Sequence, residues 1–501
     1  MTSTPSVSDP EVVERLREVL LGARYHEQHL ADELTGEQRP SKDGESTHSD
    51  DELPSELQAW LDQPELVPLI RLFWSGAELA AEEIDELLAP LDAERLEAAG
   101  VIVRENGQVR RSVGIVPLDG LMIAIEPLDP ADPPSDVVTG VSPASATLGW
   151  LTERRDVETA LDLGTGCGTQ ALFAARHARQ VVGTDVNPRA LEFAEFNSRL
   201  NGLTNIEWLE GSWFEPVAGR SFDLIVSNPP FVVSPESALV YRDSDMPGDA
   251  VSRHVVREAA AHLTEEGRAH VLVNWVHDRE ADWSAPLREW VADTDCDAIL
   301  VHYGSEQPVD YATKWNQAVG ERDFHEFNET LRRWLEYYEQ AGIDRIATGA
   351  VFLRRRSAGE NRVSAIKAAA GPSGPAGEQV GRLVTGAEAL AAESSDETLL
   401  DAVLQPVEGL TIEERGVYRG GAYVSSEAIV KLVPGLGLEV RVDGMTAAAL
   451  RHGNGARGFR QLLRAAADGG EPSDEQLTAA GASVRELIAK GLSTTSSGRS
   501  Q

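Results

Sequence analysis

Cysteine, lysine and long apolar runs are all scarce in this chain of 501 residues. Its two cysteines, Cys167 and Cys296, do not lie at a spacing typical of a metal site, so we expect neither a disulfide framework nor a bound metal. No apolar run approaches the roughly 18 residues that a membrane-spanning helix needs. The first ten residues are small and polar, which does not fit an export signal. We therefore expect a cytoplasmic protein with no membrane partner.

Positive charge is also scarce. The chain has 45 lysines and arginines against 82 acidic residues, a net charge of −37, and only five of the basic residues are lysine. A broad surface that attracts the phosphates of duplex nucleic acid is not expected from this balance. The charge argues against a nucleic-acid partner, although a local arginine patch would be compatible with it, and the acidity is also what adaptation to high salt would produce.

What the sequence does contain is ample core material, because 42% of its residues are hydrophobic. At about 150 residues per domain this length favours about three domains. Four prolines between residues 126 and 136 and a Gly-Pro-rich stretch at 371–377 suggest the boundaries. We expect an N-terminal accessory domain at 1–136, a central domain at 137–356, a linker at 357–377 and a C-terminal accessory domain at 378–501.

The N-terminal domain is expected to be helical, with apolar periodicity in residues 11–35 and 54–99 and a polar, turn-rich stretch at 36–55 between them. An Asn106-Gly107 turn then predicts a hairpin. Helices followed by such a hairpin resemble a winged helix, and the C-terminal domain could hold a second one. Because the hairpin arginines face an acidic helix, docking to protein or a structural role is favoured over DNA binding.

In the central domain, short apolar segments alternate with helical ones, which predicts a doubly wound α/β sheet. Seven segments are expected to be strands: residues 159–163, 181–184, 206–209, 224–227, 269–274, 298–301 and 349–353.

A glycine-rich turn, DLGTGCGT at residues 162–169, follows the first of these strands and opens a helix. Glycine lets the backbone turn sharply and leaves no Cβ between it and a ligand. The next strand ends in Asp185, which is placed to accept hydrogen bonds from both hydroxyls of a ribose. Asn187 and Pro188 then begin a helix. A glycine turn with no ligand is the plain alternative.

The glycine spacing distinguishes between cofactors. A dinucleotide site has the form Gly-x-Gly-x-x-Gly, whereas this chain has Gly-x-Gly-x-Gly, which resembles motif one of the class I S-adenosylmethionine-dependent methyltransferases. The resemblance implies a Rossmann-like core with a seven-stranded, mostly parallel sheet and S-adenosylmethionine as the cofactor, whose cationic sulfonium tolerates a nearby acid. It implies cofactor contacts by residues of the glycine turn and of the end of the next strand, and by one residue of a later motif: Asp162, Gly164, Thr165, Gly166, Gly168, Asp185, Val186, Asn187 and Asn228.

A second motif, Asn228-Pro229-Pro230-Phe231, stands at the carboxyl end of an apolar strand, where ligands bind in doubly wound sheets. Methylation of a planar NH2 group requires that its nitrogen be oriented. The Asn228 side-chain oxygen and the Pro229 carbonyl can each accept one N–H, and Phe231 can stack on the planar acceptor. This tetrad is typical of N-methyltransferases that act on amides or amino groups. A strand followed by a purely structural turn is the alternative.

Residues 207–231 resemble the HemK/PrmC group, which methylates the glutamine amide of translation release factors. The resemblance implies an adenine site at Ser212 and Trp213, where the group typically has Asp at the position of Ser212. It extends over residues 159–267 and leaves both flanking domains outside. We therefore expect an enzyme that methylates a protein glutamine amide.

Two other functions stay open at this point. The same tetrad occurs in enzymes that methylate adenine N6 or guanine N2 in DNA or RNA, and a non-catalytic cofactor-binding scaffold is the third possibility. A polar loop after the tetrad is expected on the acceptor side, with Tyr241, Arg242 and Asp243 as substrate contacts. Ser142 is expected to cap a helix near the methionine end of the cofactor.

Overall fold

The computed structural model describes residues 4–26, 66–89, 91–127, 134–236, 246–317, 324–357, 361–392, 395–453, 455–467 and 470–496. The expected substrate contacts Tyr241, Arg242 and Asp243 lie outside these residues, as does the polar stretch at 36–55. The chain divides into two compact units: Met1–Ser145, Asp156–Pro247 and Ala312–Tyr337 form the first, and Ala146–Arg155, Gly248–Tyr311 and Tyr338–Gln501 form the second.

The described residues of the first unit form helices in both segments whose periodicity predicts them, residues 11–35 and 54–99. These helices are α1 (Pro10–Gly22), α4 (Leu66–Leu69), the π-turn η1 (Ile70–Trp74), α5 (Ala81–Leu88) and α6 (Ala93–Ala98). The predicted hairpin is present as β2 (Ile102–Glu105) and β3 (Gln108–Arg111), and β3 also pairs with β1 (Leu79–Ala80). Asn106 and Gly107 both have positive φ, as this two-residue turn requires.

A second hairpin, β4 (Gly114–Leu118) and β5 (Leu121–Ile125), follows and pairs antiparallel. The chain then enters α7 (Pro143–Leu151), where the Ser142 hydroxyl accepts a hydrogen bond from the Ser145 N–H at 3.1 Å. The predicted helix cap at Ser142 is therefore confirmed.

Four parallel strands of the first unit carry the two sequence motifs. They are β6 (Val157–Leu163), β7 (Ala178–Asp185), β8 (Ile206–Glu210) and β9 (Phe222–Ser227), in the order β9-β6-β7-β8. Helix α8 (Thr169–Ala174) follows β6 and α9 (Pro188–Leu200) follows β7.

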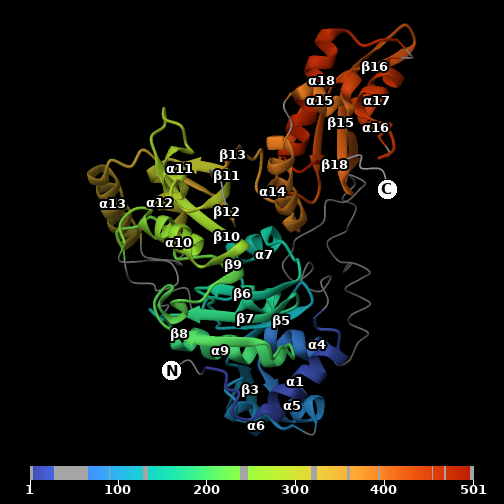
Figure 1. Cartoon of the computed structure of the whole chain (residues 1–501). Helices are drawn as coiled ribbons and strands as arrows, with labels where there is room; N and C mark the ends of the chain where they lie inside the picture. The colour runs from blue at the N-terminus through green and yellow to red at the C-terminus, as the bar shows by residue number, and fades with distance from the viewer. Residues whose placement is uncertain are drawn as a thin grey trace. The chain divides into compact units, whose positions relative to one another are not determined.

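One hydrophobic core joins α8 and α9 to the N-terminal segment. It includes Leu172 of α8 and Phe193 and Phe196 of α9 together with buried residues from α1 to β5. Figure 1 shows α9 between strands β7 and β8 on one side and α1 on the other. The N-terminal segment is therefore packed through a shared hydrophobic core against the helices that follow the cofactor motif.

The second unit holds the other four strands of what is an eight-stranded sheet. They run β13-β11-β12-β10, with β10 (Leu263–His277), β11 (Cys296–Glu306), β12 (Arg345–Arg355) and β13 (Val363–Lys367). Strand β12 is antiparallel to both of its neighbours, whereas β11 and β13 are parallel. Helices α10 (Ala250–Ala261) and α11 (Ala285–Val291) belong to this unit, whereas most of α12 (Pro308–Gln317) and α13 (Phe324–Ala341) belongs to the first.

The α/β fold with a large, mostly parallel sheet is confirmed, and every segment expected to be a strand is one. The sheet has one strand more than the seven expected. The additional strand, β13, lies inside the stretch at 357–377 that we expected to be a linker, and its alternating sequence VSAIK extends the sheet beyond β11. Strand β13 was not predicted because its residues are mostly half-buried and do not form the continuous apolar run that is typical of a central strand.

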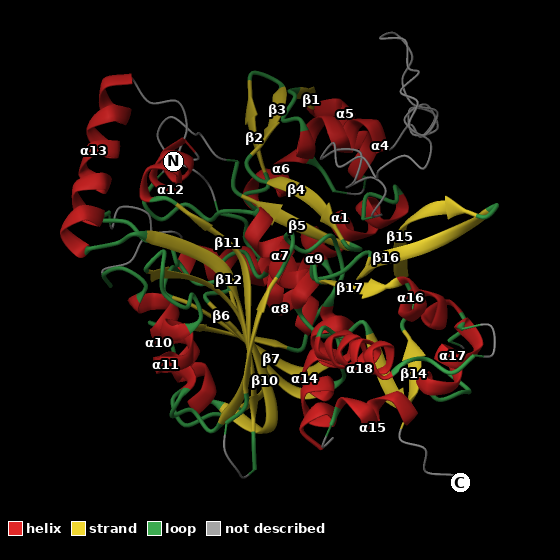
Figure 2. Cartoon of the chain, turned by 90° about the horizontal axis from the view of Figure 1, so that it is seen from above, coloured by secondary structure: helices red, strands yellow, loops and turns green. Residues whose placement is uncertain are grey.

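After β13, the chain forms α14 (Gly377–Ala392) and α15 (Asp396–Asp401), a β14–β18 pair, and a three-stranded antiparallel sheet. Figure 2 shows β15 and β16 of that sheet as a long hairpin. The bounds are β14 (Val403–Pro406), β15 (Leu410–Arg419), β16 (Ala422–Leu432), β17 (Glu439–Asp443), α16 (Gly444–Arg451), α17 (Phe459–Ala466), α18 (Asp474–Ala489) and β18 (Ser493–Ser496).

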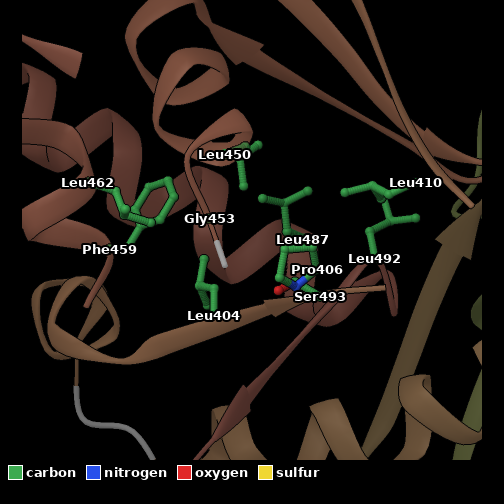
Figure 3. Close-up of a pocket in the computed structure, with 10 residues that line it drawn as sticks. All are labelled: Leu404, Pro406, Leu410, Leu450, Gly453, Phe459, Leu462, Leu487, Leu492 and Ser493. Atoms are coloured by element: carbon green, nitrogen blue, oxygen red, sulfur yellow. The ribbon is translucent and has the colours of Figure 1, made fainter. Parts of the chain in front are cut away.

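The interior of this C-terminal region is apolar and closely packed. Figure 3 shows Leu404, Phe459 and Leu487 among the side chains that line a cavity of about 10 Å³ there. This volume would hold about one water molecule, so the cavity is a packing void rather than a ligand site. No helix among the described residues is long and apolar enough to cross a membrane.

Candidate active site

The register of the parallel strands brings the two sequence motifs to one edge of the sheet. Leu163, the last residue of β6, pairs with Ser227 of β9 on one side and with Thr184 of β7 on the other. The residues that follow are therefore neighbours: the glycine loop after β6, Asp185 at the end of β7 and the Asn-Pro-Pro-Phe tetrad after β9. The Ser227 hydroxyl donates to the Leu163 carbonyl at 2.9 Å, which ties these strand ends together.

The backbone of the glycine loop requires glycine. Gly164, Gly166 and Gly168 have φ of 71°, 54° and 91°, a region that other residues rarely adopt. A Cβ built on Gly164 or Gly166 would meet no atom within 4 Å, so the protein leaves space beside these two residues. A Cβ on Gly168 would instead lie 3.1 Å from the Ala194 side chain, because here the loop packs against α9. Two of the glycines thus face open space and the third is needed for packing.

The buried carboxyl group of Asp162 is hydrogen-bonded to the glycine loop and to the helix that follows it. Its side chain is 1% exposed, and its Oδ2 accepts hydrogen bonds from the Thr165 hydroxyl at 2.6 Å and from the Ala171 N–H at 2.8 Å. Burial raises the pKa of this carboxyl to about 7. A carboxyl with such a pKa is poised to ionise when a cation binds near it.

Asp185 connects the end of β7 to the same loop. Its Oδ2 accepts from the Gly166 N–H at 2.8 Å and its Oδ1 from the Asn187 N–H at 2.9 Å. Burial raises the pKa of this carboxyl as well. Each carboxylate oxygen has a further lone pair, so both can still accept a hydrogen bond from a ligand. Val186, the next residue, is 55% exposed, which is unusual for valine and leaves an apolar surface beside the carboxylate.

Asn187 is occupied within the protein. Its Oδ1 caps α9 by accepting from the Arg189 N–H at 3.0 Å, and its Nδ2 donates to the Asp136 carbonyl at 2.8 Å. The expected helix start is confirmed. The side chain anchors the segment before α7, and of its polar groups only a remaining Oδ1 lone pair and the second Nδ2 hydrogen have no bond described.

Ser212 and Trp213 follow β8 at the same sheet edge. The last residue of β8, Glu210, is in register with Asp185, and the Gly211 N–H donates to the Asp185 carbonyl at 3.0 Å. Trp213 has φ 50°, a left-handed conformation that costs a non-glycine residue about 1–2 kcal/mol. Both side chains are half-buried. Strained residues of this kind cluster at ligand sites, and this one stands next to the ribose-binding candidate.

The Asn-Pro-Pro-Phe tetrad differs from the glycine loop in the hydrogen bonding of its polar side chain. Asn228 and Phe231 are half-buried and Pro229 is buried. Among the described residues, no hydrogen bond to the Asn228 side chain is found, in contrast to the side chains of Asp162 and Asp185. An amide that is partly shielded from water and has no protein partner is suited to bind a ligand that supplies the missing partners.

Sequence reasoning missed a buried glutamine beside this site. Gln170, in α8, is 6% exposed, and its Nε2 donates to the Ser145 carbonyl at 2.7 Å, which fixes the first turn of α7 against the helix that follows the glycine loop. Its Oε1 is buried without a hydrogen-bond partner among the described residues. The sequence did contain a signal for this residue: Gln170 is a polar residue in a helix whose other residues are mostly apolar.

Comparison with known proteins agrees with this arrangement. Residues 141–291 match the methyltransferase small domain, and residues 45–112 match a domain of unknown function (DUF7059). A release factor glutamine methyltransferase of Agrobacterium fabrum is 32% identical over 205 residues, which cover 38% of this chain and 69% of that protein. This chain belongs to the release factor glutamine methyltransferase family.

Other members of the release factor glutamine methyltransferase family match a shorter stretch. The protein of Xylella fastidiosa strain Temecula1 is 39% identical over 113 residues, 22% of this chain, and that of Escherichia coli is 34% identical over 122 residues. The chain therefore spans about two fifths of the length of these relatives, 40% and 43% respectively.

Solved structures add little to the family assignment. The YcgJ protein of Bacillus subtilis is 16% identical, with a TM-score of 0.30, and its alignment covers 43% of this chain and 99% of that protein. At these values the likeness carries no argument about function.

Proposed function

We propose that this protein transfers a methyl group from S-adenosylmethionine to the side-chain amide of a glutamine in a protein acceptor of the release-factor kind. The observation that carries the proposal is the Asn228 amide, which has no hydrogen-bond partner among the described residues and directly follows Ser227, the residue in register with Leu163 just before the glycine loop. S-adenosylmethionine supplies the methyl group when it is bound.

The residues of the first unit fit this cofactor. The open space beside Gly164 and Gly166 accommodates the methionine part, the free lone pairs of Asp185 accept from the ribose hydroxyls, and Val186 and Trp213 flank the adenine. Asp162 lies beneath the loop, where a nearby sulfonium would favour its ionised form. Ser212 can offer the adenine amino group an acceptor in place of the Asp that the family typically has.

On the acceptor side, Asn228 and Pro229 orient the nitrogen. A glutamine amide carries two N–H groups, and the Asn228 Oδ1 and the Pro229 carbonyl are two acceptors that a strand end holds close together. Binding both N–H groups in one plane fixes the direction in which the nitrogen meets the methyl group, and this positioning is the main catalytic contribution that these residues make. Phe231 packs on the flat face of the amide.

The arginines of the β2–β3 hairpin favour a protein acceptor over a nucleic acid. Arg104 donates to Glu97 at 2.8 Å, and Arg111 is turned inward, where it donates to the Phe73 carbonyl at 2.6 Å and to the Trp74 carbonyl. Of the three arginines of the hairpin, Arg104, Arg110 and Arg111, the first and the last are therefore bound within the protein. Together with the net charge of −37, this leaves the hairpin poorly suited to duplex recognition.

The test is transfer of labelled methyl from S-adenosylmethionine to purified release factors and, in parallel, to total RNA and DNA of the source cells. Label that survives nuclease treatment, is lost on protease treatment and maps to a glutamine supports the proposal. Label that is lost on nuclease treatment would replace the acceptor with a base amine and leave the rest of the site in place.

The control is the Asn228→Ala variant in the same assays. It separates transfer by this site from transfer by a contaminating enzyme, because only the former depends on the tetrad. Absence of transfer to every acceptor, with intact cofactor binding, would instead favour a non-catalytic scaffold.

A further inference from the structure

Two asparagines of α9 bind the edge of a strand from the N-terminal segment. The Asn197 Oδ1 accepts from the Ala124 N–H at 2.7 Å, and its Nδ2 donates to the Ala124 carbonyl at 3.0 Å. One turn further along α9, the Asn201 Oδ1 accepts from the Met122 N–H at 2.9 Å and its Nδ2 donates to the Met122 carbonyl at 2.7 Å. Each side chain thus bonds both backbone groups of one residue of β5.

The spacing of the two elements makes this pairing possible. Residues four apart in a helix are separated by about 6 Å along its axis, and residues two apart in a strand by about 6.8 Å. One edge of β5 pairs with β4, and the backbone groups of Met122 and Ala124 on the other edge are paired by the two asparagines. The side chains take the place of a neighbouring strand, which leaves this edge without unpaired groups.

The two asparagines differ in their last hydrogen bond. The second hydrogen of Asn197 Nδ2 goes to the Cys167 carbonyl, at 2.9 Å, within the glycine loop. The second hydrogen of Asn201 Nδ2 goes to the carbonyl of Asn197 in its own helix, at 2.8 Å. Asn197 is fully buried, and its oxygen and both hydrogens are used, so the Cys167 carbonyl, the side chain and β5 have a fixed arrangement.

We infer that Asn197 is a positioning residue that couples the β4–β5 hairpin to the glycine loop, and thereby makes the N-terminal segment part of the support of the cofactor site. The inference rests on the proposed function for the identity of the cofactor. The loop turns at three residues with positive φ, and the Cys167 carbonyl lies between the last two of them. Holding that carbonyl selects one conformation of the loop, and a pre-arranged loop binds its ligand more tightly than one that must be ordered on binding.

Asn201 provides a matched control for Asn197. Asn197→Ala and Asn201→Ala each remove two hydrogen bonds to β5, and we expect both to lower the melting temperature. Only Asn197→Ala frees the Cys167 carbonyl. We expect it to weaken S-adenosylmethionine binding by about 10-fold or more, measured by calorimetry on the full chain, whereas Asn201→Ala changes the affinity less than twofold. Equal losses in the two variants, or no loss in either, would overturn the inference.

A second measurement uses the unmodified protein, so it does not depend on whether the variants fold. Hydrogen exchange is followed at the two β5 amides with and without S-adenosylmethionine. We expect binding to slow exchange at the Ala124 N–H, which Asn197 holds, by several-fold more than at the Met122 N–H, which Asn201 holds. Equal responses would contradict the coupling. Failure of the wild-type chain to bind S-adenosylmethionine at all would be visible in the same calorimetry and would overturn the proposed function together with this inference.

Discussion

The cofactor side and the acceptor side of the site are built in opposite ways. On the cofactor side, the carboxylates of Asp162 and Asp185 each accept two hydrogen bonds from the protein, and these bonds hold the glycine loop in shape. On the acceptor side, the Asn228 amide has no partner among the described residues. The two carboxylates of the first side are thus bonded within the protein, whereas the amide of the second side is bonded to none of the described residues.

This difference has a physical reason. Under the proposed function, a new molecule of S-adenosylmethionine, always of the same structure, binds in every turnover, so a rigid site avoids the cost of ordering the loop at each binding event. The acceptor amide must instead be bound by groups whose hydrogen-bonding capacity is otherwise unused, because any internal partner would compete with it. Substitutions on the two sides should therefore have separable effects on affinity and on turnover.

The largest effect is expected at Asn228. Asn228→Ala should lower turnover by about 10²- to 10³-fold, the range found when one group that orients or stabilises a reacting centre is lost, while S-adenosylmethionine affinity stays unchanged. Steady-state kinetics and calorimetry measure the two quantities. The control is Asn205→Ala. It is the same chemical change, but Asn205 precedes β8 and so lies at the amino ends of the strands, away from the site. Wild-type turnover in Asn228→Ala would mean that the tetrad is structural.

A smaller but still large effect is expected for Asp185→Ala on cofactor affinity. The change removes the ribose acceptors and leaves the Gly166 and Asn187 N–H groups without their partner. We expect binding of S-adenosylmethionine to weaken by about 100-fold, which corresponds to about 2.7 kcal/mol. Calorimetry of the purified variant checks this, with its melting temperature as the control for folding. An unchanged affinity would contradict the assignment of Asp185 to the ribose.

The pH dependence of cofactor binding should show whether the Asp162 carboxyl group ionises when the cofactor binds. Burial raises the pKa of this carboxyl to about 7, and a cationic ligand favours the ionised form, so binding of S-adenosylmethionine should release a proton. Affinity is then low below this pKa and rises through it, by about 10-fold between pH 6 and pH 8. S-adenosylhomocysteine, which has a neutral sulfur, should show a flatter profile, and Asp162→Asn should remove the difference. Identical profiles for the two ligands in the wild-type protein would place the sulfonium away from Asp162.

The smallest effect is expected at the β2–β3 hairpin. Arg104 and Glu97 form an exposed ion pair that is screened by solvent, so Arg104→Ala should leave the free energy of unfolding almost unchanged. Methylation of a protein acceptor should stay within about twofold of wild type in the double variant Arg104→Ala, Arg110→Ala. A loss of activity that grows as the salt concentration falls would show that the hairpin contacts a nucleic acid instead.

Much of the site follows from short stretches of sequence. Positive φ at three glycines, an acid at the end of the next strand and a proline-rich turn after another strand are local requirements of backbone and chemistry, and the structure places all of them at one sheet edge. The substrate contacts proposed at Tyr241, Arg242 and Asp243 stay a prediction. So do the boundaries of the three domains, and the cofactor and acceptor roles assigned to single residues.

The sequence by itself therefore determined the α/β core, seven of the eight strands of its sheet and the turns that follow them, because glycine conformation, strand periodicity and the Asn-Pro-Pro-Phe turn act over a few residues. Tertiary structure alone decided how Asn197 and Asn201 close the edge of β5, 73 and 79 residues before them in the chain, and which way Arg111 turns. From the sequence alone, an asparagine in a helix is predicted to lie on the solvent-exposed face. Which backbone groups it meets depends on packing between distant segments, and no local pattern records that.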